Sequence, residues 1–269
     1  MQAAVYDRYY EIQPQFHERD EVPAWITRAR TFVVVVNRID GRGELIRDNA
    51  NESMLILPAG ITATIKTARE VLEAADDSLT ILPAGRHTIS CAGSGSIVRI
   101  FTTAERDLCE RAPNRDVYRD EPDASLPVAV RDTLLHYRLA DHIDGNTSLP
   151  MRVFRSQYLM ANLFVPQDQP RDLSRLTPHS HADFEQGSLA LAGTYTHHLR
   201  YPWIPDHAQW LEDEHVTMDS PSLVVIPRSV IHTTTNDSGT QDRLIDIFSP
   251  PRQDFLDRGI VCNANDYRS

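Results

Sequence analysis

Short apolar runs alternate with turn residues along most of the chain. Residues 31–37, 61–66 and 223–226 are runs rich in β-branched and aliphatic side chains. Gly60 precedes the second run, Pro227 follows the third, and Gly41 lies shortly after the first. Runs of this length between turn signals are typical of strands in β-sandwiches and barrels. Residues 40–43, Asp-Gly-Arg-Gly, are predicted to form one of the turns. The pattern therefore predicts an all-β fold.

The two halves of the chain resemble each other. LTILP at 79–83 recurs as LVVIP at 223–227, and IVRIF at 97–101 recurs as LIDIF at 244–248. The spacing Glu52-x7-Gly60 recurs as Glu185-x7-Gly193. Between the halves, residues 104–131 are charged and rich in proline, which suits a connector. We expect two tandem β-barrels from an internal duplication, at residues 1–120 and 121–269.

Four residues of the second half are candidate metal ligands. His179 and His181 lie one residue apart, so on an extended segment both project to the same side. Glu185 has the same parity, and His232 would come from another strand. Three imidazoles and one carboxylate suit Fe(II), Mn(II), Ni(II), Co(II) or Zn(II), and suit Ca(II) poorly. We predict one divalent transition metal, bound in the second domain by these four residues.

Other polar residues near these ligands are candidates for catalysis. His197 and His198 are adjacent, so one should face the barrel interior and the other the outside. Tyr195 shares the parity of His197. Arg155 lies on a strand that leads toward the site, where an inward guanidinium would anchor an anion. We take His197, Tyr195 and Arg155 as the catalytic candidates; the alternatives are a surface histidine and an outer-face salt bridge. Residues 202–210 could form a lid or pack against the other half.

These residues match two known motifs. His179, His181 and Glu185 fit G-x5-H-x-H-x3,4-E-x6-G, and Pro227, His232 and Asn236 fit G-x5-P-x-G-x2-H-x3-N. The second half thus resembles the cupin superfamily, and the duplicated chain resembles a bicupin. The resemblance implies an RmlC-like jelly roll, the double-stranded β-helix, with a metal inside the barrel.

The chain departs from the motifs in its turns. Leu173, Pro221 and Ser229 replace glycines, and Glu185 to Gly193 is one residue longer than the consensus. Such substitutions are tolerable where φ stays negative, and none touches a ligand position.

The first half lacks the ligand set. The repeat offsets place Ile46, Asp48 and Thr88 at the positions of the three histidines, with His87 one residue early. A shift of one residue on a strand turns a side chain to the opposite face. We therefore expect a degenerate first domain without metal ligands.

The resemblance implies a metal-dependent enzyme. Our first hypothesis is an Fe(II)- or Mn(II)-dependent oxidoreductase of the dioxygenase type, acting on a small anionic or aromatic molecule. The alternatives are a metal-dependent isomerase of sugars or keto-uronates, and a non-catalytic cupin that binds a small molecule.

The composition limits the kinds of binding partner that we expect. With 27 Lys and Arg against 38 Asp and Glu, the net charge is −11, which argues against nucleic-acid binding. No apolar run approaches the roughly 18 residues that cross a bilayer. Three cysteines without C-x-x-C spacing, and a start without a signal-peptide pattern, lead us to expect a cytoplasmic protein. We expect a small-molecule substrate and a homodimer.

Overall fold

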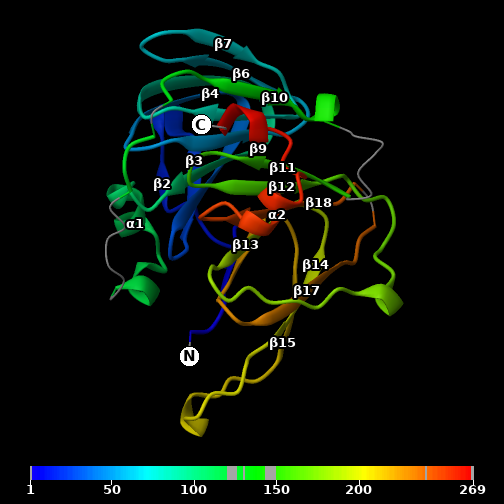
Figure 1. Cartoon of the computed structure of the whole chain (residues 1–269). Helices are drawn as coiled ribbons and strands as arrows, with labels where there is room; N and C mark the ends of the chain where they lie inside the picture. The colour runs from blue at the N-terminus through cyan, green and yellow to red at the C-terminus, as the bar shows by residue number, and fades with distance from the viewer. Residues whose placement is uncertain (1, 120–125, 130, 143–149, 240, 268–269) are drawn as a thin grey trace. The chain divides into compact units, whose positions relative to one another are not determined.

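Strands are the main regular secondary structure of the chain (Figure 1). The computed structural model describes residues 2–119, 126–129, 131–142, 150–239 and 241–267. The chain forms two compact units. The C-terminal unit comprises Met1–Ile12 and Ala161–Phe248, and the N-terminal unit comprises Gln13–Met160 and Ser249–Ser269. The predicted boundary between residues 120 and 121 lies outside the described residues.

The N-terminal unit contains most of the strands and both α-helices. Seven strands follow the order β10-β8-β5-β9-β4-β3-β2, and β6 pairs with β7 and β9. The strands are β2 (Phe16–His17), β3 (Pro23–Arg28), β4 (Phe32–Asn49), β5 (Ser53–Leu57), β6 (Ile61–Lys66), β7 (Val71–Ala74), β8 (Ser78–Leu82), β9 (Gly85–Thr102), β10 (Leu135–Arg138) and β11 (Met151–Arg155). The helices are α1 (Arg106–Arg111), α2 (Gln253–Asp257) and the 3-10 turns Arg19–Glu21, Arg115–Tyr118, Leu139–His142 and Ala264–Tyr267.

Two long strands, β4 and β9, pair with each other in this unit. They pair along 18 residues each, from Phe32 with Thr102 to Asn49 with Gly85. The first half of β9 also pairs with β6, and its second half pairs with β5. Gly93 marks the change, with φ +126° and no room for a Cβ atom, which would meet Gly60 O at 2.1 Å. The turn predicted at residues 40–43 is therefore wrong, because that stretch lies inside β4 and pairs with β9 without interruption.

The C-terminal unit consists of two sheets. One has the order β1-β16-β13-β18-β12, and the other has the order β15-β14-β17. Its strands are β1 (Val5–Arg8), β12 (Met160–Phe164), β13 (Gln186–Ala192), β14 (Tyr195–Arg200), β15 (Glu214–Met218), β16 (Ser222–Ile226), β17 (Ile231–Asn236) and β18 (Arg243–Phe248). Two 3-10 turns, Leu173–Arg175 and His207–Gln209, lie in its loops. None of the described helices is long and apolar enough to span a membrane.

The strand orders of the two units agree with a duplication. The order β8-β5-β9-β4 in the N-terminal unit corresponds to β16-β13-β18-β12 in the C-terminal unit. The repeated runs LTILP and LVVIP begin in β8 and β16, at the same place in this order. Every residue of β5, β8 and β16 is buried. Burial on both faces explains why these strands read as continuous apolar runs instead of alternating ones.

Candidate metal centre

Three histidines of the C-terminal unit come together. One ring nitrogen each of His179, His181 and His232 lies within 4.8 Å of the other two. Backbone hydrogen bonds hold the loop with the first two histidines against β17. His179 N donates to His232 O at 3.1 Å, and His232 N donates to His179 O at 2.8 Å. Ser229 N also donates to His181 O, at 2.7 Å. The predicted convergence of these three residues therefore rests on main-chain pairing.

The ring orientations of two of these histidines leave a nitrogen lone pair free to bind a metal. His179 Nδ1 lies 2.9 Å from Thr177 O, and His232 Nδ1 lies 2.9 Å from Val230 O. A carbonyl oxygen only accepts, so each Nδ1 must carry the ring proton. Each Nε2 is then left with a lone pair, which is the form that binds a cation.

Gln186 places a side-chain oxygen beside two of the histidines. Its Oε1 lies 3.1 Å from His181 Nε2 and 3.2 Å from His232 Nε2. The carboxylate of Glu185 is buried and accepts a hydrogen bond from Gln2 Nε2 at 2.9 Å. The structure thus brings together three of the four predicted ligands and leaves Glu185 out of the cluster.

The local backbone explains this difference. The prediction assumed one continuous strand from His181 to Glu185, but residues 182–183 bend and β13 begins only at Gln186. A bend breaks the alternation of side chains, so parity no longer carries across it. The motif itself supports Gln186, since Gln186-x6-Gly193 has the consensus spacing that Glu185 exceeds by one residue.

The four residues fit a transition metal. Two ligands about 2.1 Å from one ion and at right angles lie about 3 Å apart, which matches the separations from Gln186 Oε1. His232 Nε2 has a lone pair and Gln186 Oε1 is an acceptor, so both atoms can face the same cation. Three imidazoles and one amide oxygen suit Mn(II), Fe(II), Co(II), Ni(II) or Zn(II).

Aromatic residues support the cluster from one side. The ring of His181 stacks on Phe184, with centroids 4.8 Å apart, and meets Phe248 edge-on at 5.6 Å. His232 is buried, whereas His179 is exposed. A small molecule would therefore reach the site from the side of His179.

Two of the three catalytic candidates lie in the interior of this unit. His197 and Tyr195, both on β14, are buried as their shared parity requires. His197 Nδ1 lies 3.2 Å from Thr234 Oγ1, and His197 Nε2 has no hydrogen-bond partner among the described residues. Burial, with the nearby His198 and His232, lowers the pKa of His197 to about 3. Burial also raises the pKa of Tyr195. Both side chains are therefore neutral near pH 7.

Arg155 lies in the N-terminal unit. Its Nε donates to Ser156 O at 3.0 Å, and its guanidinium stands over the ring of Tyr267, 5.0 Å from the centroid. Burial lowers its pKa, while Tyr267 and Glu52 oppose that shift. Glu52 is itself buried and accepts from Gln157 N at 2.7 Å. These contacts give Arg155 a place in a polar cluster of the N-terminal unit, and its catalytic role stays a prediction.

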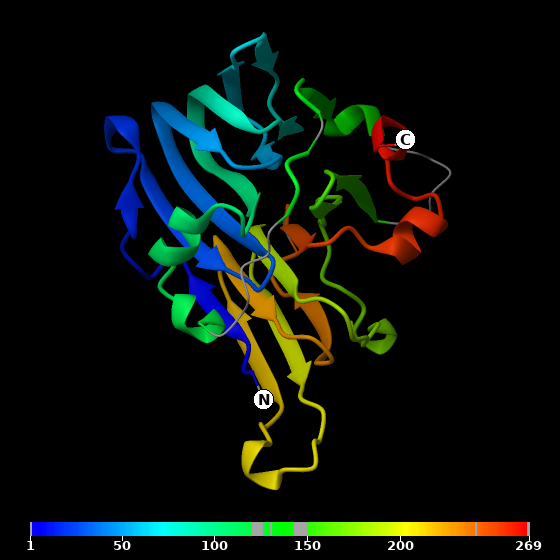
Figure 2. The ribbon, with the colours of Figure 1, turned by 60° about the vertical axis from the view of Figure 1, so that its left-hand side comes forward.

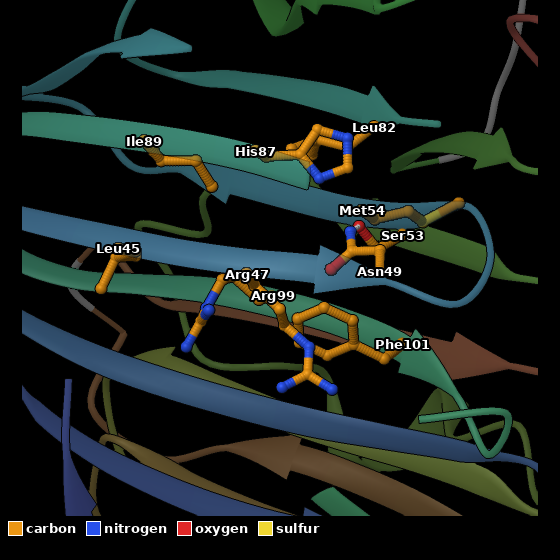
Figure 3. Close-up of a pocket in the computed structure, with 10 residues that line it drawn as sticks. All are labelled: Leu45, Arg47, Asn49, Ser53, Met54, Leu82, His87, Ile89, Arg99 and Phe101. Atoms are coloured by element: carbon orange, nitrogen blue, oxygen red, sulfur yellow. Dashed lines mark hydrogen bonds between the residues drawn. The ribbon is translucent and has the colours of Figure 1, made fainter. Parts of the chain in front are cut away.

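The N-terminal unit has a polar cavity in its interior (Figure 3). Arg47, Asn49, Ser53 and His87 contribute to its wall, and the space holds about one water molecule. Asn49 Nδ2 donates to Ser53 Oγ at 2.7 Å, and Arg47 pairs with Glu105 at 2.5 Å. Arg47 Nε, Asn49 Oδ1 and His87 Nδ1 are buried without a hydrogen-bond partner among the described residues.

This cavity corresponds to the histidine site of the other unit. Arg47 pairs with His87 across β4 and β9, just as His179 pairs with His232. The counterparts are Arg47 for His179, Asn49 for His181, Ser53 for Gln186 and His87 for His232. The predicted counterparts Ile46, Asp48 and Thr88 are each wrong by one residue, because insertions between the repeats made the sequence offsets ambiguous by one position.

Buried His87 predicts a loss of stability in acid. Burial lowers its pKa to about 4, although Asp48 and the Pro83 backbone oppose the shift. Between the unfolded value of about 6.5 and this folded value, only the unfolded chain takes up the proton. The contribution is complete above about pH 6.5, and about 3 kcal/mol of unfolding free energy is lost as the pH falls to 4. Urea denaturation at several pH values measures it.

The control for this prediction is His87→Gln, which cannot take up the proton. Its unfolding free energy should depend less on pH between 6.5 and 4, and its tightly bound metal should stay near the wild-type amount. An unchanged pH dependence would remove His87 as the cause, and a loss of metal would contradict a centre built in the C-terminal unit alone.

Ser229 carries backbone strain. Replacement of the consensus glycine is tolerable where φ stays negative, but Ser229 has φ +65°. Left-handed backbone costs a residue with a Cβ atom about 1–2 kcal/mol relative to glycine. Ser229→Gly is therefore expected to raise the unfolding free energy by about 1 kcal/mol, measured by urea denaturation at neutral pH. Ser180→Gly, which also replaces a serine in a loop of this site, is the control and should give no gain.

The long connection between β14 and β15 is the yellow loop at the bottom of Figure 2. The rings of Trp203 and Trp210 stack with centroids 4.7 Å apart, and Trp210 Nε1 donates to Ile204 O at 2.7 Å. Trp203 remains 79% exposed. The predicted role as a lid stays a prediction.

Solved structures share this architecture. Oxalate decarboxylase from Lactobacillus farciminis, solved as a formate complex, has a TM-score of 0.61 at 10% identity, over 92% of this chain and 86% of that chain. A structure of Bacillus subtilis oxalate decarboxylase, from work on its Mn(II) centres, has a TM-score of 0.59 at 11% identity, over 92% and 77%. The chain has a bicupin fold.

A further solved structure supports the bicupin fold. AerE from Microcystis aeruginosa has a TM-score of 0.54 at 12% identity, over 85% of this chain and 92% of that chain. No protein-family model and no curated protein sequence matches the chain. The predicted pair of jelly-roll barrels from an internal duplication is confirmed.

Proposed function

We propose that the C-terminal unit of this bicupin is a metal-dependent catalytic centre for a small anionic or aromatic molecule. The observation that carries this proposal is the cluster of three histidine nitrogens within 4.8 Å, with Gln186 Oε1 beside two of them. A divalent ion bound there supplies a Lewis acid, a template for substrate oxygens and, for Fe(II) or Mn(II), a path for electrons.

The charge of the ligand set favours an anionic substrate. His179, His181, His232 and Gln186 are all neutral as ligands, so none of them offsets the charge of a divalent ion. A carboxylate or enolate from the substrate would offset it. The similar structures named for oxalate decarboxylase support the same substrate class, since oxalate is a small dicarboxylate.

His197 and Tyr195 are proposed to contact the substrate. His197 Nε2 is a buried polar atom without a partner among the described residues, and such atoms are costly unless a ligand or water satisfies them. Because its pKa is about 3, His197 would act as a neutral hydrogen-bonding group and not as an acid near pH 7. Tyr195, with its raised pKa, would keep its proton and donate it in a hydrogen bond.

The proposed reaction class is oxidation, with the dioxygenase type first. Isomerisation of a sugar or keto-uronate is the second candidate, and the neutral ligand set favours it because it leaves the ion strongly electrophilic. A non-catalytic cupin that binds a small molecule is the third.

Oxygen consumption separates these candidates. The protein loaded with Fe(II) or Mn(II) would be tested against oxalate, keto acids, catechols and gentisate. The proposal predicts O2 uptake in step with substrate loss. Turnover under strict anaerobiosis would sink the dioxygenase reading. A product with the same composition as its substrate would favour isomerisation, and tight binding without turnover would favour the binding protein. Light scattering would test the proposed homodimer.

A further inference from the structure

A second pair of imidazoles lies on the other face of β14 from His197. Side chains alternate along a strand, so His197 is buried and its neighbour His198 is turned outward. His198 pairs directly with His215 across β14 and β15. Two antiparallel strands therefore hold the two rings side by side at the surface of the C-terminal unit.

The two rings meet nitrogen to nitrogen. His198 Nδ1 lies 2.8 Å from His215 Nδ1, and the ring centroids are 4.9 Å apart. At neutral pH one Nδ1–H donates to the lone pair of the other ring. Arg200, at the end of β14, and Asp213, just before β15, form an ion pair at 2.8 Å and offset each other.

The pair opens onto a pocket. A hollow of about 220 Å³ is lined by both rings and by Arg200, Asp213 and Thr233, among others. His215 is exposed, so a solute has direct access to the nitrogens. His232 also contributes to the wall, so the pocket borders the histidine triad.

We propose that His198 and His215 form a second, solvent-accessible site for a divalent transition metal. Two nitrogens bound about 2.0–2.1 Å from one ion lie about 2.9 Å apart at a right angle and about 3.3 Å apart at the tetrahedral angle. The observed 2.8 Å is within a few tenths of an ångström of both. On binding, the donating ring moves its proton from Nδ1 to Nε2, so both Nδ1 lone pairs face the ion and no proton is lost. Water or a small solute would complete the coordination.

The chemistry of the donors selects the ion. Imidazole nitrogens suit Ni(II), Cu(II) and Zn(II), whereas Mg(II) and Ca(II) require oxygen ligands. With two protein ligands, the site would be weaker than the triad and would exchange its ion freely. The proposal uses no ligand of the triad, so it stands or falls separately from the proposed function.

Nickel binding tests the site. Untagged protein carrying its tightly bound metal would be dialysed against increasing NiCl2, and bound nickel would be counted by elemental analysis. The wild type is expected to take up about one additional Ni(II) per chain. His215→Ala should weaken this uptake at least about tenfold, and because His215 is exposed the fold should persist.

Two further variants make the result specific. His17→Ala removes an exposed strand histidine of the N-terminal unit and should keep the additional Ni(II). His179→Ala should lose the tightly bound metal and still show the nickel uptake that depends on His215. No additional nickel in the wild type, or equal uptake by His215→Ala and wild type, would overturn the proposal. An equal loss in His17→Ala would overturn it as well.

Discussion

Replacement of His232 by alanine is expected to remove the tightly bound metal from the purified protein while the chain stays folded. His232 is buried, and its Nε2 lies 3.2 Å from Gln186 Oε1, at the inner end of the cluster. The variant keeps His179 and His181 but loses the ligand that β17 contributes. We expect the metal content to fall from about one per chain to below about one tenth, because affinity depends on the complete ligand set. Elemental analysis measures this content.

The matched control is His215→Ala, which removes an exposed histidine from the same unit. It should keep the tightly bound metal, and circular dichroism should show β structure in both variants. Equal metal content in His232→Ala and wild type would remove His232 from the centre.

Substitutions at Gln186 and Glu185 are expected to change different properties, metal affinity at Gln186 and unfolding free energy at Glu185. Gln186→Ala removes the oxygen beside His181 and His232, and should lower metal affinity about 10–100-fold. Glu185→Ala should keep the metal. It should instead lower the unfolding free energy by about 1–3 kcal/mol, because it deletes the buried acceptor of the Gln2 amide. Competition with a chelator measures the first effect, and urea denaturation measures the second.

Gln186→Glu completes this comparison. It keeps an oxygen at the same position and adds a negative charge, so metal affinity should rise or stay equal. If Glu185→Ala lost the metal and Gln186→Ala kept it, the ligand would be the one that the motif first indicated, and the described geometry would be wrong.

Much of the fold could be predicted from the sequence. Strands such as β8 and β16 lie in the middle of a sheet and are buried on both faces. Such strands have continuous apolar runs, which are visible in the sequence. The duplication was visible because these two runs retain similar residues. The turn expected at residues 40–43 was wrong because glycine marks both turns and bent strands, and only the pairing of β4 with β9 distinguishes them.

The candidate site was predictable in part. The motif and the expected strand pairing predicted that His179, His181 and His232 lie together. The structure brings these three residues together. The fourth position depended on parity across residues 182–183, where the chain bends, so the prediction chose Glu185. The spacing Gln186-x6-Gly193 was the sequence signal for the residue whose side-chain oxygen lies beside two of the histidines.

The counterpart site in the N-terminal unit was misplaced by the same kind of error. Counting along the repeat selected Ile46 and Asp48, while the pairing of Arg47 with His87 places the neighbouring residues in the interior. A shift of one residue is invisible in a repeat with insertions, yet it exchanges the two faces of a strand.

Anomalous diffraction from crystals of the metal-loaded protein tests the central claim most directly. The account predicts one strong peak in the C-terminal unit, within bonding distance of a ring nitrogen of His179, His181 and His232 and of Gln186 Oε1. A peak bonded to the carboxylate of Glu185, or a metal-loaded protein without a peak among these histidines, would contradict it.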